Sequence, residues 1–504
     1  MRKKLSLLLC LLLLASSLTS LVSCSEAPSD NIGNNESGNT PSSGDVAETE
    51  PEETEITREN TPDSLPTDLK FDGTTINIYH FGTDSTVKYD CLGDFSGDVV
   101  LDAVYNRNVA VEERLGVKLN YIAGSSDWNG FPTDVTNSII SGSTDYDMII
   151  EECSRLFQQS LYGYLFDINS LDNDYINFEQ PWWYADMMAE GSLDNTKRFF
   201  GIGDINLTVM FGASACYFNK EMFTNYFGEI DQLYTHVKEG TWTTDVFADY
   251  CERVYTDLNG DGQKDAGDIM GFRYEQWGIP NYLSMSTGLS YITRDSDGYP
   301  VLDINNERGM EWGEKLYKLL YTNNISMEGS KLDTFINKTS LFLLGQFDTA
   351  HQLRDVDFSY GLLPYPKIAE DLDYMSAAAT VNGNGVGIPV SAPVEKIPAS
   401  CAAIELLCAE SYRHVVPAWY DTALKIKYSD GLDDAQMVDI IYEHIGCPFI
   451  MMADKELGTG SIYTYGIWGS TTDGAFASYY AGQSKSLDKK LARAIEEYKK
   501  LGGS

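Results

Sequence analysis

Short apolar runs alternate with amphipathic stretches in the first part of the folded chain. The predicted strands are Thr75–Phe81, Val117–Ile122 and Tyr146–Ile150, and the predicted helices are Leu101–Leu115 and a segment that ends within Asn137–Ser141. The first helix carries apolar residues at helical spacing and is followed by Gly116, which suits a helix end. Strands that alternate with helices indicate a parallel sheet with crossover helices, so the predicted fold class is α/β.

One carboxylate follows the last of these strands directly. In open α/β sheets, ligands bind beyond the carboxyl ends of the strands. Glu151 occupies that position and is therefore a candidate ligand-binding residue. A solvated loop carboxylate is an equally good interpretation of the same residue.

A later segment has the pattern of a chain that leaves one structural unit and enters another. The apolar run from Tyr360 is ended by Pro364 and Pro366, which cannot donate to a sheet ladder. Alternate glycines follow in Val381–Pro389, where the backbone can pass close to another strand or to a ligand. We expect a strand to end at the prolines, and the chain to cross and re-enter a sheet through the glycine segment.

The N-terminus has the pattern of a targeting segment. Positive residues precede the apolar run Leu5–Leu14, which is shorter than the roughly 20 residues that span a bilayer. The run leads into Leu21-Val22-Ser23-Cys24, which matches the lipobox of bacterial lipoproteins. We therefore predict a signal peptide at 1–23 and a lipid on Cys24 that holds the protein on the extracellular face of the cell membrane. Ordinary secretion with cleavage nearby is the alternative.

Residues 24–64 are predicted to be a disordered tether, with the folded domain at 65–504. From Ser25 to Ser64 the chain has eleven acidic residues, one arginine and almost no apolar side chains. Such a segment cannot bury enough surface to offset its ordering entropy.

Composition narrows the class of protein further. A length of 504 residues exceeds one ordinary core, so two or more lobes are expected. The net charge of −39 argues against a nucleic-acid partner, because phosphate binding needs basic patches. The scattered cysteines and five histidines show neither a disulfide framework nor zinc spacing.

The sharpest chemical motif follows a predicted helix at Thr241–Thr256. Residues 257–268 match the twelve-residue calcium loop, in which oxygen ligands recur at fixed positions around a glycine turn. The predicted ligands are Asp257, Asn259, Asp261, the backbone of Gln263, Asp265 and Asp268. A polar turn without metal is the alternative, and position 12 is an aspartate with shorter reach than the usual glutamate. We predict one structural Ca²⁺.

The order of several segments resembles a known family. The segments are YFNK at Tyr217–Lys220, TW at the start of the 241–256 segment, YGLLPYPK, and GIPVSAP with the small-residue helix that follows it. In this order they resemble the carbohydrate-type solute-binding proteins of ABC importers, which are relatives of maltose-binding protein. The resemblance implies a periplasmic-binding-protein-like α/β fold with two lobes, a hinge and an interlobe cleft. It implies a first lobe at about 71–203 and 365–440, and a second at about 204–364 and 441–500. The first crossing at Gly201–Ile205 would put Asp204 near the cleft.

Several aromatic residues are candidate platforms for a sugar face. In a chain of this kind they are Trp182, Trp183, Phe347, Trp468 and, more weakly, Trp277. Paired tryptophans such as Trp182 and Trp183 are more often packing residues when all proteins are considered.

The resemblance implies a monomeric receptor, not an enzyme, that binds a carbohydrate and delivers it to ABC permease subunits. A surface glycoside hydrolase is the first alternative, since it needs only two carboxylates across an aromatic cleft. A receptor for peptides is the second. A dockerin-like scaffold component is the third, although a dockerin has two calcium loops and this chain shows one.

Overall fold

The computed structural model describes residues 57–124, 133–172, 174–194, 196–276, 278–322, 324–378, 383–425, 432–468 and 475–501. These residues belong to one compact unit, Ile56–Ser504. The strands are β1 Thr74–His80, β2 Val117–Ala123, β3 Met148–Glu152, β4 Phe200–Gly201, β5 Ser214–Asn219, β6 Phe272–Tyr274, β7 Ile292–Arg294, β8 Pro300–Leu302, β9 Ser326–Glu328, β10 Phe342–Gln346, β11 Tyr360–Leu363, β12 Ser376–Ala377, β13 Asn384–Gly387 and β14 Ile445–Gly446.

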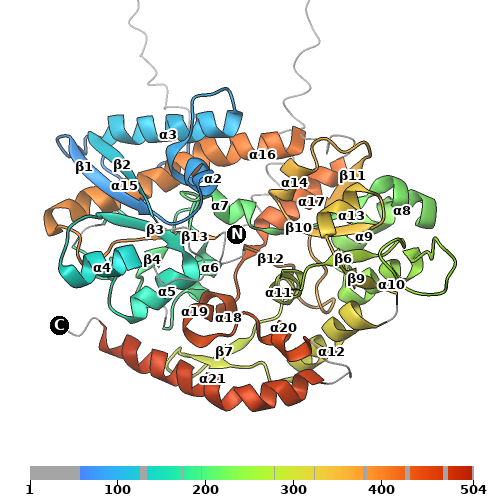
Figure 1. Ribbon diagram of the computed structural model, residues 1–504. Helices are drawn as coiled ribbons and strands as arrows, with labels where there is room; N and C mark the ends of the chain where they lie inside the picture. Colours follow the sequence, from blue (N-terminus) through green and yellow to red (C-terminus); the bar gives the residue numbers. More distant parts are fainter. Residues whose placement is uncertain are drawn as a thin grey trace, which may run out of the picture. The chain divides into compact units, whose positions relative to one another are not determined.

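Helices connect and cover these strands (Figure 1). In the first half of the unit they are α2 Asp84–Val87, α3 Val99–Leu115, α4 Thr133–Ser141, α5 Cys153–Leu161, α6 Ala185–Glu190, α7 Leu207–Phe211, α8 Lys220–Phe227, α9 Asp231–Lys238 and α10 Thr244–Val254. In the second half they are α11 Ile279–Met285, α12 Glu307–Tyr321, α13 Lys331–Ile336, α14 Thr349–Gln352, α15 Ile397–Glu410, α16 Val416–Lys425, α17 Leu432–Glu443, α18 Phe449–Met452, α19 Asp454–Leu457, α20 Ile462–Ile467 and α21 Ala475–Lys500. Single turns of π-helix occur at η1 Lys88–Leu92 and η4 Ser411–Val415, and of 3₁₀-helix at η2 Ile168–Ser170 and η3 Val394–Lys396.

The first lobe is built on a five-stranded sheet in the order β2-β1-β3-β13-β4. The pairs β1–β2 and β1–β3 are parallel, and β13 runs antiparallel to β3 and to β4. Figure 1 shows α3 and α15 on one face of this sheet and α4 and α5 on the other. Helix α3 begins where the Asp98 side chain accepts hydrogen bonds from two backbone N–H groups, and it ends at Gly116 in the left-handed conformation. The predicted parallel sheet with crossover helices is confirmed.

The second lobe is built on the antiparallel sheet β10-β5-β11. Helix α10 lies within the segment 241–256 where a helix was predicted, and it starts after Thr243, whose side chain accepts a hydrogen bond from the N–H of Val246. Helix α12 buries the apolar stripe that the sequence indicates: Trp312, Leu316 and Leu319. A two-stranded parallel pair, β6–β9, extends this lobe.

The chain crosses between the two sheets where the sequence predicts it. The first crossing leaves β4 and passes through α7 into β5. The second leaves β11 at the prolines and re-enters the first sheet at β13. Glycine is required in this second segment, because a Cβ on Gly385 would lie 3.0 Å from the carbonyl oxygen of Gly201 on β4.

A fully buried carboxylate, Asp90, fastens both crossings to the first lobe. Its oxygens accept from the backbone N–H and the hydroxyl of Thr208 at 2.8 and 2.7 Å, and from the side-chain amide of Asn384 at 3.0 Å. The Nε2 atom of His80 lies 3.2 Å away, also fully buried. Thr208 belongs to the first crossing and Asn384 begins β13 after the second. A single side chain therefore fixes the register of the two connections.

Arg107 of α3 extends this network. Its guanidinium donates to the Asp90 carbonyl at 2.7 Å, to the Ile205 carbonyl at 3.0 Å and to the Ser411 hydroxyl at 3.1 Å. Bonds from a charged donor in a dry interior are among the stronger ones, at about 1.5–3 kcal/mol each.

Three parts of the chain differ from the predicted boundaries. Residues 57–64, expected in the tether, contact the folded unit: Asp63 is paired with Arg114 and Arg413. Helix α17, expected in the first lobe, packs on β11 and α9 of the second. Helices α18 and α19, expected in the second lobe, pack on α5 of the first. The three helices have apolar residues that fit either lobe, so their local pattern does not determine which sheet they cover. Residues 57–64 are polar, and distant ionic partners hold them in place.

The C-terminal helix α21, Ala475–Lys500, contacts both lobes. Near its start, the ring of Phe476 stacks on Tyr463 of α20 with centroids 4.4 Å apart. Near its end, Tyr498 packs on Phe199 beside β4 with centroids 5.9 Å apart. Of the four residues that the sequence places on its apolar face, Leu487, Leu491 and Tyr498 are buried and Ile495 is half-buried.

Candidate functional site

The candidate site is the region between the carboxyl-terminal edge of the first sheet and the second lobe. Strands β1, β3 and β4 run parallel and end at this edge, and both crossings leave or enter here. Ligands in open α/β sheets bind outside this edge. On the opposite side lie the end of β10, at Gln346, and the start of β5, at Ser214, which are paired with each other.

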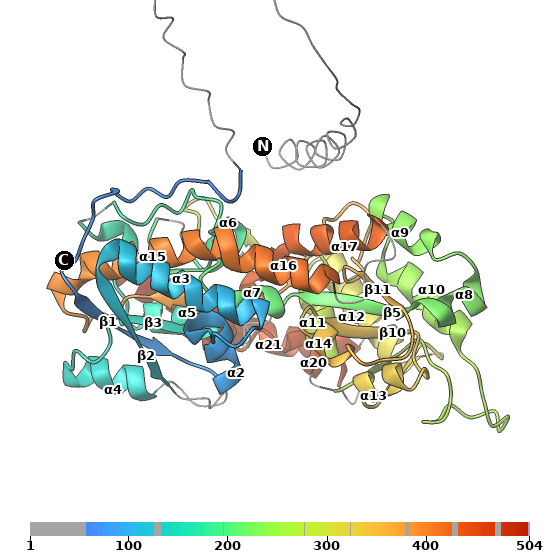
Figure 2. The ribbon, with the colours of Figure 1, turned by 90° about the horizontal axis from the view of Figure 1, so that it is seen from above.

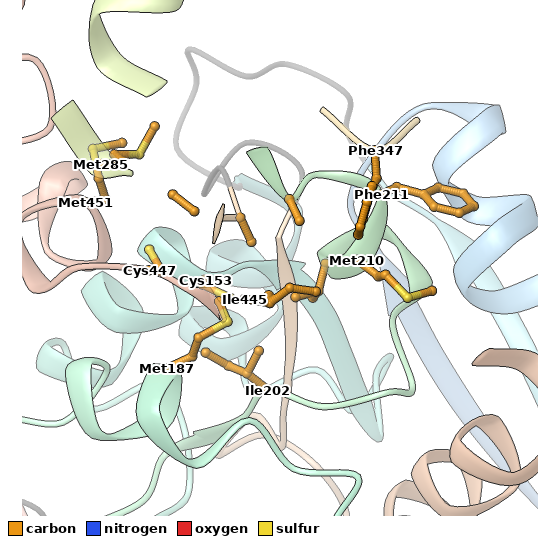
Figure 3. Close-up of a cluster of buried hydrophobic side chains, with 14 of the residues drawn as sticks. Cys153, Met187, Ile202, Met210, Phe211, Met285, Phe347, Ile445, Cys447 and Met451 are labelled. Atoms are coloured by element: carbon orange, nitrogen blue, oxygen red, sulfur yellow. The ribbon is translucent and has the colours of Figure 1, made fainter. Parts of the chain in front are cut away.

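An apolar seam joins the two lobes at the base of this region. Figure 3 shows buried side chains from both lobes turned toward one another. Its labelled members are Cys153, Met187, Ile202, Met210, Phe211, Met285, Phe347, Ile445, Cys447 and Met451. Four of these ten residues are methionines. A methionine side chain is flexible, so it can repack at a low cost in free energy when the space between the lobes changes shape.

Helices α11 and α20 form the second-lobe side of the site. Asn281 of α11 accepts from the hydroxyl of Thr464 at 2.5 Å, and its amide lies 3.5 Å from the hydroxyl of Ser461, so the two helices are fastened together. Figures 1 and 2 both show them on the side of the second lobe that faces the first.

An exposed aromatic pair continues from α20. Trp468, a predicted sugar platform, is 39% exposed, and Tyr465 one turn earlier is 46% exposed. Their rings are near-parallel, with centroids 6.3 Å apart and planes at 29°. Flat apolar ring faces turned to solvent suit the apolar face of a pyranose. Sequence analysis found Trp468 and missed Tyr465, although the i, i+3 spacing of two aromatics was visible.

The other described aromatic candidates are packing residues. Trp182 and Trp183 are 1% and 2% exposed. The indole N–H of Trp183 donates to Glu405 of α15 at 3.3 Å, and its ring packs on Phe178. Both rings are covered by protein, so the expectation that they stack on a ligand is corrected.

Phe347 is 4% exposed and belongs to the seam between the lobes. Its ring packs on Trp419 of α16 with centroids 5.1 Å apart. Phe347 therefore packs between the lobes, and the expectation that its ring stacks on a ligand is corrected. Trp277 lies outside the described residues.

Glu151 is neither a cleft carboxylate nor a solvated one. It is fully buried on β3, and its Oε2 accepts from the side chain of Gln159 on α5 at 2.5 Å. Burial raises the pKa of this carboxyl to about 8, against the lowering effects of Arg155 and Gln159. Near neutral pH the side chain is therefore largely protonated.

Asp204 lies in the first crossing, as predicted, but it is 3% exposed. It accepts from the hydroxyl of Tyr184 at 2.9 Å and lies 3.8 Å from Arg58. Burial raises its pKa to about 6, and Arg58 and Tyr184 act in the opposite direction. In this structure Asp204 is therefore part of the joint between the lobes.

Sequence analysis missed a carboxylate on the second-lobe side. Asp348 directly follows Phe347 at the end of β10, and burial raises its pKa to about 6, with Lys331 lowering it. Lys331 lies 3.9 Å from Glu275, just beyond β6. The available signal was position, since Asp348 directly follows the mostly apolar run 341–347.

Two cavities lie away from this region. One of 520 Å³ is lined by Ser64 and by residues of 168–179 in the first lobe. One of 390 Å³ lies on the second lobe beside the start of α12.

The predicted calcium loop forms a compact turn held by its own side chains. Asp257 accepts from the N–H groups of Gly260 and Gly262 at 2.7 and 2.8 Å. Carboxylate oxygens of Asp261 and Asp265 converge on the amide nitrogen of Asn259, at 3.2 and 2.9 Å. Asp268 is buried, and its oxygens accept from the N–H groups of Leu258 and Asp265.

Among the residues the structure describes, no three His, Cys, Asp or Glu side chains are gathered closely enough to hold a metal ion. The convergence of two carboxylates on one point fits a cation, whereas Asp268 is turned to backbone donors. Calcium at this loop stays a prediction.

Comparison with solved structures shows the same fold of two α/β lobes in binding proteins of ABC transporters. The chain is similar to UgpB from Mycobacterium tuberculosis in complex with glycerophosphocholine, at 13% identity and TM-score 0.52, over 84% of this chain and 100% of that one. It is similar to an ABC transporter associated binding protein from B. animalis subsp. lactis in complex with β-1,6-galactobiose, at 14% identity and TM-score 0.51, over 83% and 98%.

It is also similar to an ABC substrate-binding protein from Listeria monocytogenes in complex with cycloalternan, at 15% identity and TM-score 0.50, over 82% and 99%. No protein-family model and no curated protein sequence matches the chain. The likenesses show that this chain has the two-lobe solute-binding-protein fold.

None of the helices in the described part of the chain is both long enough and apolar enough to cross a membrane.

The raised pKa of the buried Glu151 carboxyl predicts that the stability of the fold depends on pH. An acid whose pKa rises from 4.5 to about 8 on folding stabilises the fold fully below pH 4.5, and this contribution is lost as the pH rises toward 8. Glu151→Gln keeps the shape and cannot ionise. We expect its unfolding free energy to exceed that of the wild type increasingly between pH 5 and pH 8, by on the order of 3–5 kcal/mol at the upper end.

Urea unfolding at several pH values measures this difference. The exposed Glu179 provides a matched control, and Glu179→Gln should leave the pH profile unchanged. A difference between Glu151→Gln and wild type that stays constant from pH 5 to pH 8 would contradict the prediction.

The calcium loop predicts a response to chelation. A ligand that binds only the folded state stabilises it by about 2.7 kcal/mol at a hundredfold excess over Kd. Calcium added to metal-stripped protein should therefore raise the melting temperature, and Asp257→Ala and Asp261→Ala should each abolish the rise. Asp249→Ala, at an exposed position on the preceding helix α10, should preserve it. Identical melting with calcium and with chelator would exclude the site.

Proposed function

We propose that this protein is a solute receptor that captures a saccharide between its two lobes and delivers it to the permease subunits of an ABC importer. The observation that supports this most is the two-lobe fold, with the exposed Tyr465–Trp468 pair on the second-lobe side of the candidate site. Two of the similar structures hold the saccharides cycloalternan and β-1,6-galactobiose. The receptor would work as a monomer and would return its ligand chemically unchanged.

The chemistry around the site favours a neutral, hydroxyl-rich ligand. The side chains near its edges are carboxylates, amides and hydroxyls, including Asp348, Gln346 and Asn281, which exchange hydrogen bonds with sugar hydroxyls. A net charge of −39 disfavours an anionic solute, since the summed field of the protein repels it. A peptide ligand remains the alternative within the receptor class.

Saccharide binding is tested with the chain from Ile56 on, which is one compact unit. Stacking a sugar face on an indole contributes on the order of 1–2 kcal/mol, so Trp468→Ala should weaken binding about tenfold without lowering the melting temperature. Thermal shift with glucose, maltose, β-1,6-galactobiose and cycloalternan identifies a ligand, and calorimetry then measures Kd.

The matched control is Tyr162→Ala, which removes a 47% exposed ring at the C-terminal end of α5, the end of that helix away from the β3 edge, and should leave Kd unchanged. Product analysis decides the remaining alternatives. Release of a cleaved sugar would favour the glycoside hydrolase. A shift from peptides and from none of the sugars would keep the receptor class and overturn the saccharide.

We further propose that Cys24 carries a lipid that holds the receptor at the extracellular face of the cell membrane. The support is the sequence Leu21-Val22-Ser23-Cys24 after the apolar run, which lies outside the described residues. Two or three acyl chains give stable anchoring, at about 0.8 kcal/mol per buried CH₂.

Metabolic labelling with a tagged fatty acid tests the anchor. The wild type should be labelled and sediment with membranes, and Cys24→Ala should lose both properties. Cys10→Ala, a cysteine inside the apolar run, should keep them. Retention of the label in Cys24→Ala would disprove lipidation at this residue.

A further inference from the structure

The residues just before the first lobe form an ordered strap. We use this name for residues 57–65, most of which were expected to belong to the tether at 24–64. Figure 2 shows this part of the blue segment running along the edge of the first lobe before β1. Its sequence is polar, yet Leu65 is 5% exposed and Asp63 has a side-chain exposure of 5%. An ordered polar segment needs specific partners to offset its lost conformational entropy.

Asp63 anchors one end of the strap to the first lobe. Its carboxylate accepts two bonds from Arg114 of α3, at 2.6 and 2.8 Å, and one from Arg413 of η4 at 2.8 Å. Arg413 also donates to the carbonyl of Thr61 at 2.9 Å. Bidentate pairing of this kind fixes geometry as well as adding energy.

Arg58 holds the other end of the strap against the joint between the lobes. Its guanidinium lies over the ring of Tyr412, 3.9 Å from the centroid, and its Nε donates to the Tyr412 carbonyl at 2.7 Å. Its Nη2 donates to the hydroxyl of Tyr442 at 3.2 Å and lies 3.8 Å from Asp204. Arg58 therefore contacts three side chains that come from three different segments.

Those three segments are parts of the connection between the lobes. Asp204 belongs to the first crossing. Tyr412 belongs to η4, a turn of π-helix between α15 and α16, and such turns often mark functional sites. Tyr442 belongs to α17, which packs on β11 of the second lobe. The lobes cannot rotate relative to each other without changing at least one of the contacts that Arg58 makes.

We propose that the strap is a hinge clamp, in which Arg58 favours one relative position of the two lobes by bridging the first crossing, η4 and α17. Asp63 keeps the strap on the first lobe, and Arg58 reaches the element that moves with the second. The clamp lies at the C-terminal end of the segment predicted to be a tether. A pull on the tether would therefore act on the strap and, through it, on the lobe equilibrium.

The clamp affects ligand binding through the populations of the two lobe positions and not through contacts with the ligand. A contact made in one conformation only shifts the equilibrium by its differential free energy. The apparent affinity for any interlobe ligand then changes in proportion to the competent fraction. Arg58 is thus a positioning residue for the lobes, whatever solute they bind.

Interlobe distances in the chain from Ile56 on test the clamp without a ligand. The seven cysteines of the described chain are all buried, so spin labels can be directed to Ile140→Cys on α4 and Asn225→Cys on α8, two exposed positions, one on each lobe. Electron–electron resonance then gives the distance distribution. Arg58→Ala should change the ratio of the two lobe positions by about fivefold or more.

Two further variants isolate the effect. Tyr442→Phe removes only the hydroxyl that Arg58 contacts and should shift the ratio in the same direction by a smaller factor. If Arg58→Ala does not fold, Tyr442→Phe by itself tests the proposal. Arg253→Ala is the matched control, because Arg253 also lies over an aromatic ring, Phe227, and pairs with Asp249, but within the second lobe.

A distance distribution of Arg58→Ala that superimposes on that of the wild type would overturn the proposal, even with a lowered melting temperature, since the strap would then only stabilise. An equal shift in Arg253→Ala would overturn it as well. Saccharides play no part in this measurement, so its failure and the failure of the proposed function are separate results.

Discussion

The buried carboxylate of Asp90 is the constraint on which the arrangement of the two lobes depends. It accepts from Thr208 in the first crossing and from Asn384 after the second, so both connections are pinned to the first lobe at one point. Leaving a buried carboxylate without its partners costs about 3–5 kcal/mol, which is a large part of a typical folding free energy. Relative motion of the lobes must therefore occur beyond these pinned residues, toward the second-lobe ends of the crossings.

Much of the fold follows from local signals in the sequence. The stripe of α3 with Asp98 before it and Gly116 after it, and the Thr243 cap of α10, give helices at the predicted places. The proline-ended strand β11 and the glycine strand β13 lie in different sheets, as their residues indicate. Caps, prolines and glycines act within a few residues of themselves, which is why they can be read without the structure.

The candidate site was less predictable, because burial is a property of the whole fold. Trp183 looks like a platform in the sequence, yet its indole N–H is satisfied by Glu405, which lies far away along the chain. Glu151 follows its strand as a cleft residue would, but α5 covers it through Gln159. Arg58 sits in a tether-like composition, and its partner Tyr442 is 384 residues away. Among the candidate platforms that the structure describes, Trp468, at a helix end beside an exposed Tyr465, is the one with the exposure that its predicted role needs.

A second arginine limits how far the lobes can move. Arg294, on the β7–β8 hairpin that arises from the second lobe, donates to carbonyls at and beyond the end of α6 in the first lobe: Ala189, Ser192 and Leu193. A cation at a helix C-terminus is favoured by the helix dipole. Helix α21 runs beside this contact and has one end packed on each lobe.

Arg58 and Arg294 each bridge the lobes, so free separation of the lobes would break the contacts of both arginines at once. A small rotation about the pinned crossings changes fewer of them, and the methionines of the seam can repack as it proceeds. The motion available to this protein is therefore a limited hinge movement whose end points are set by a few charged contacts.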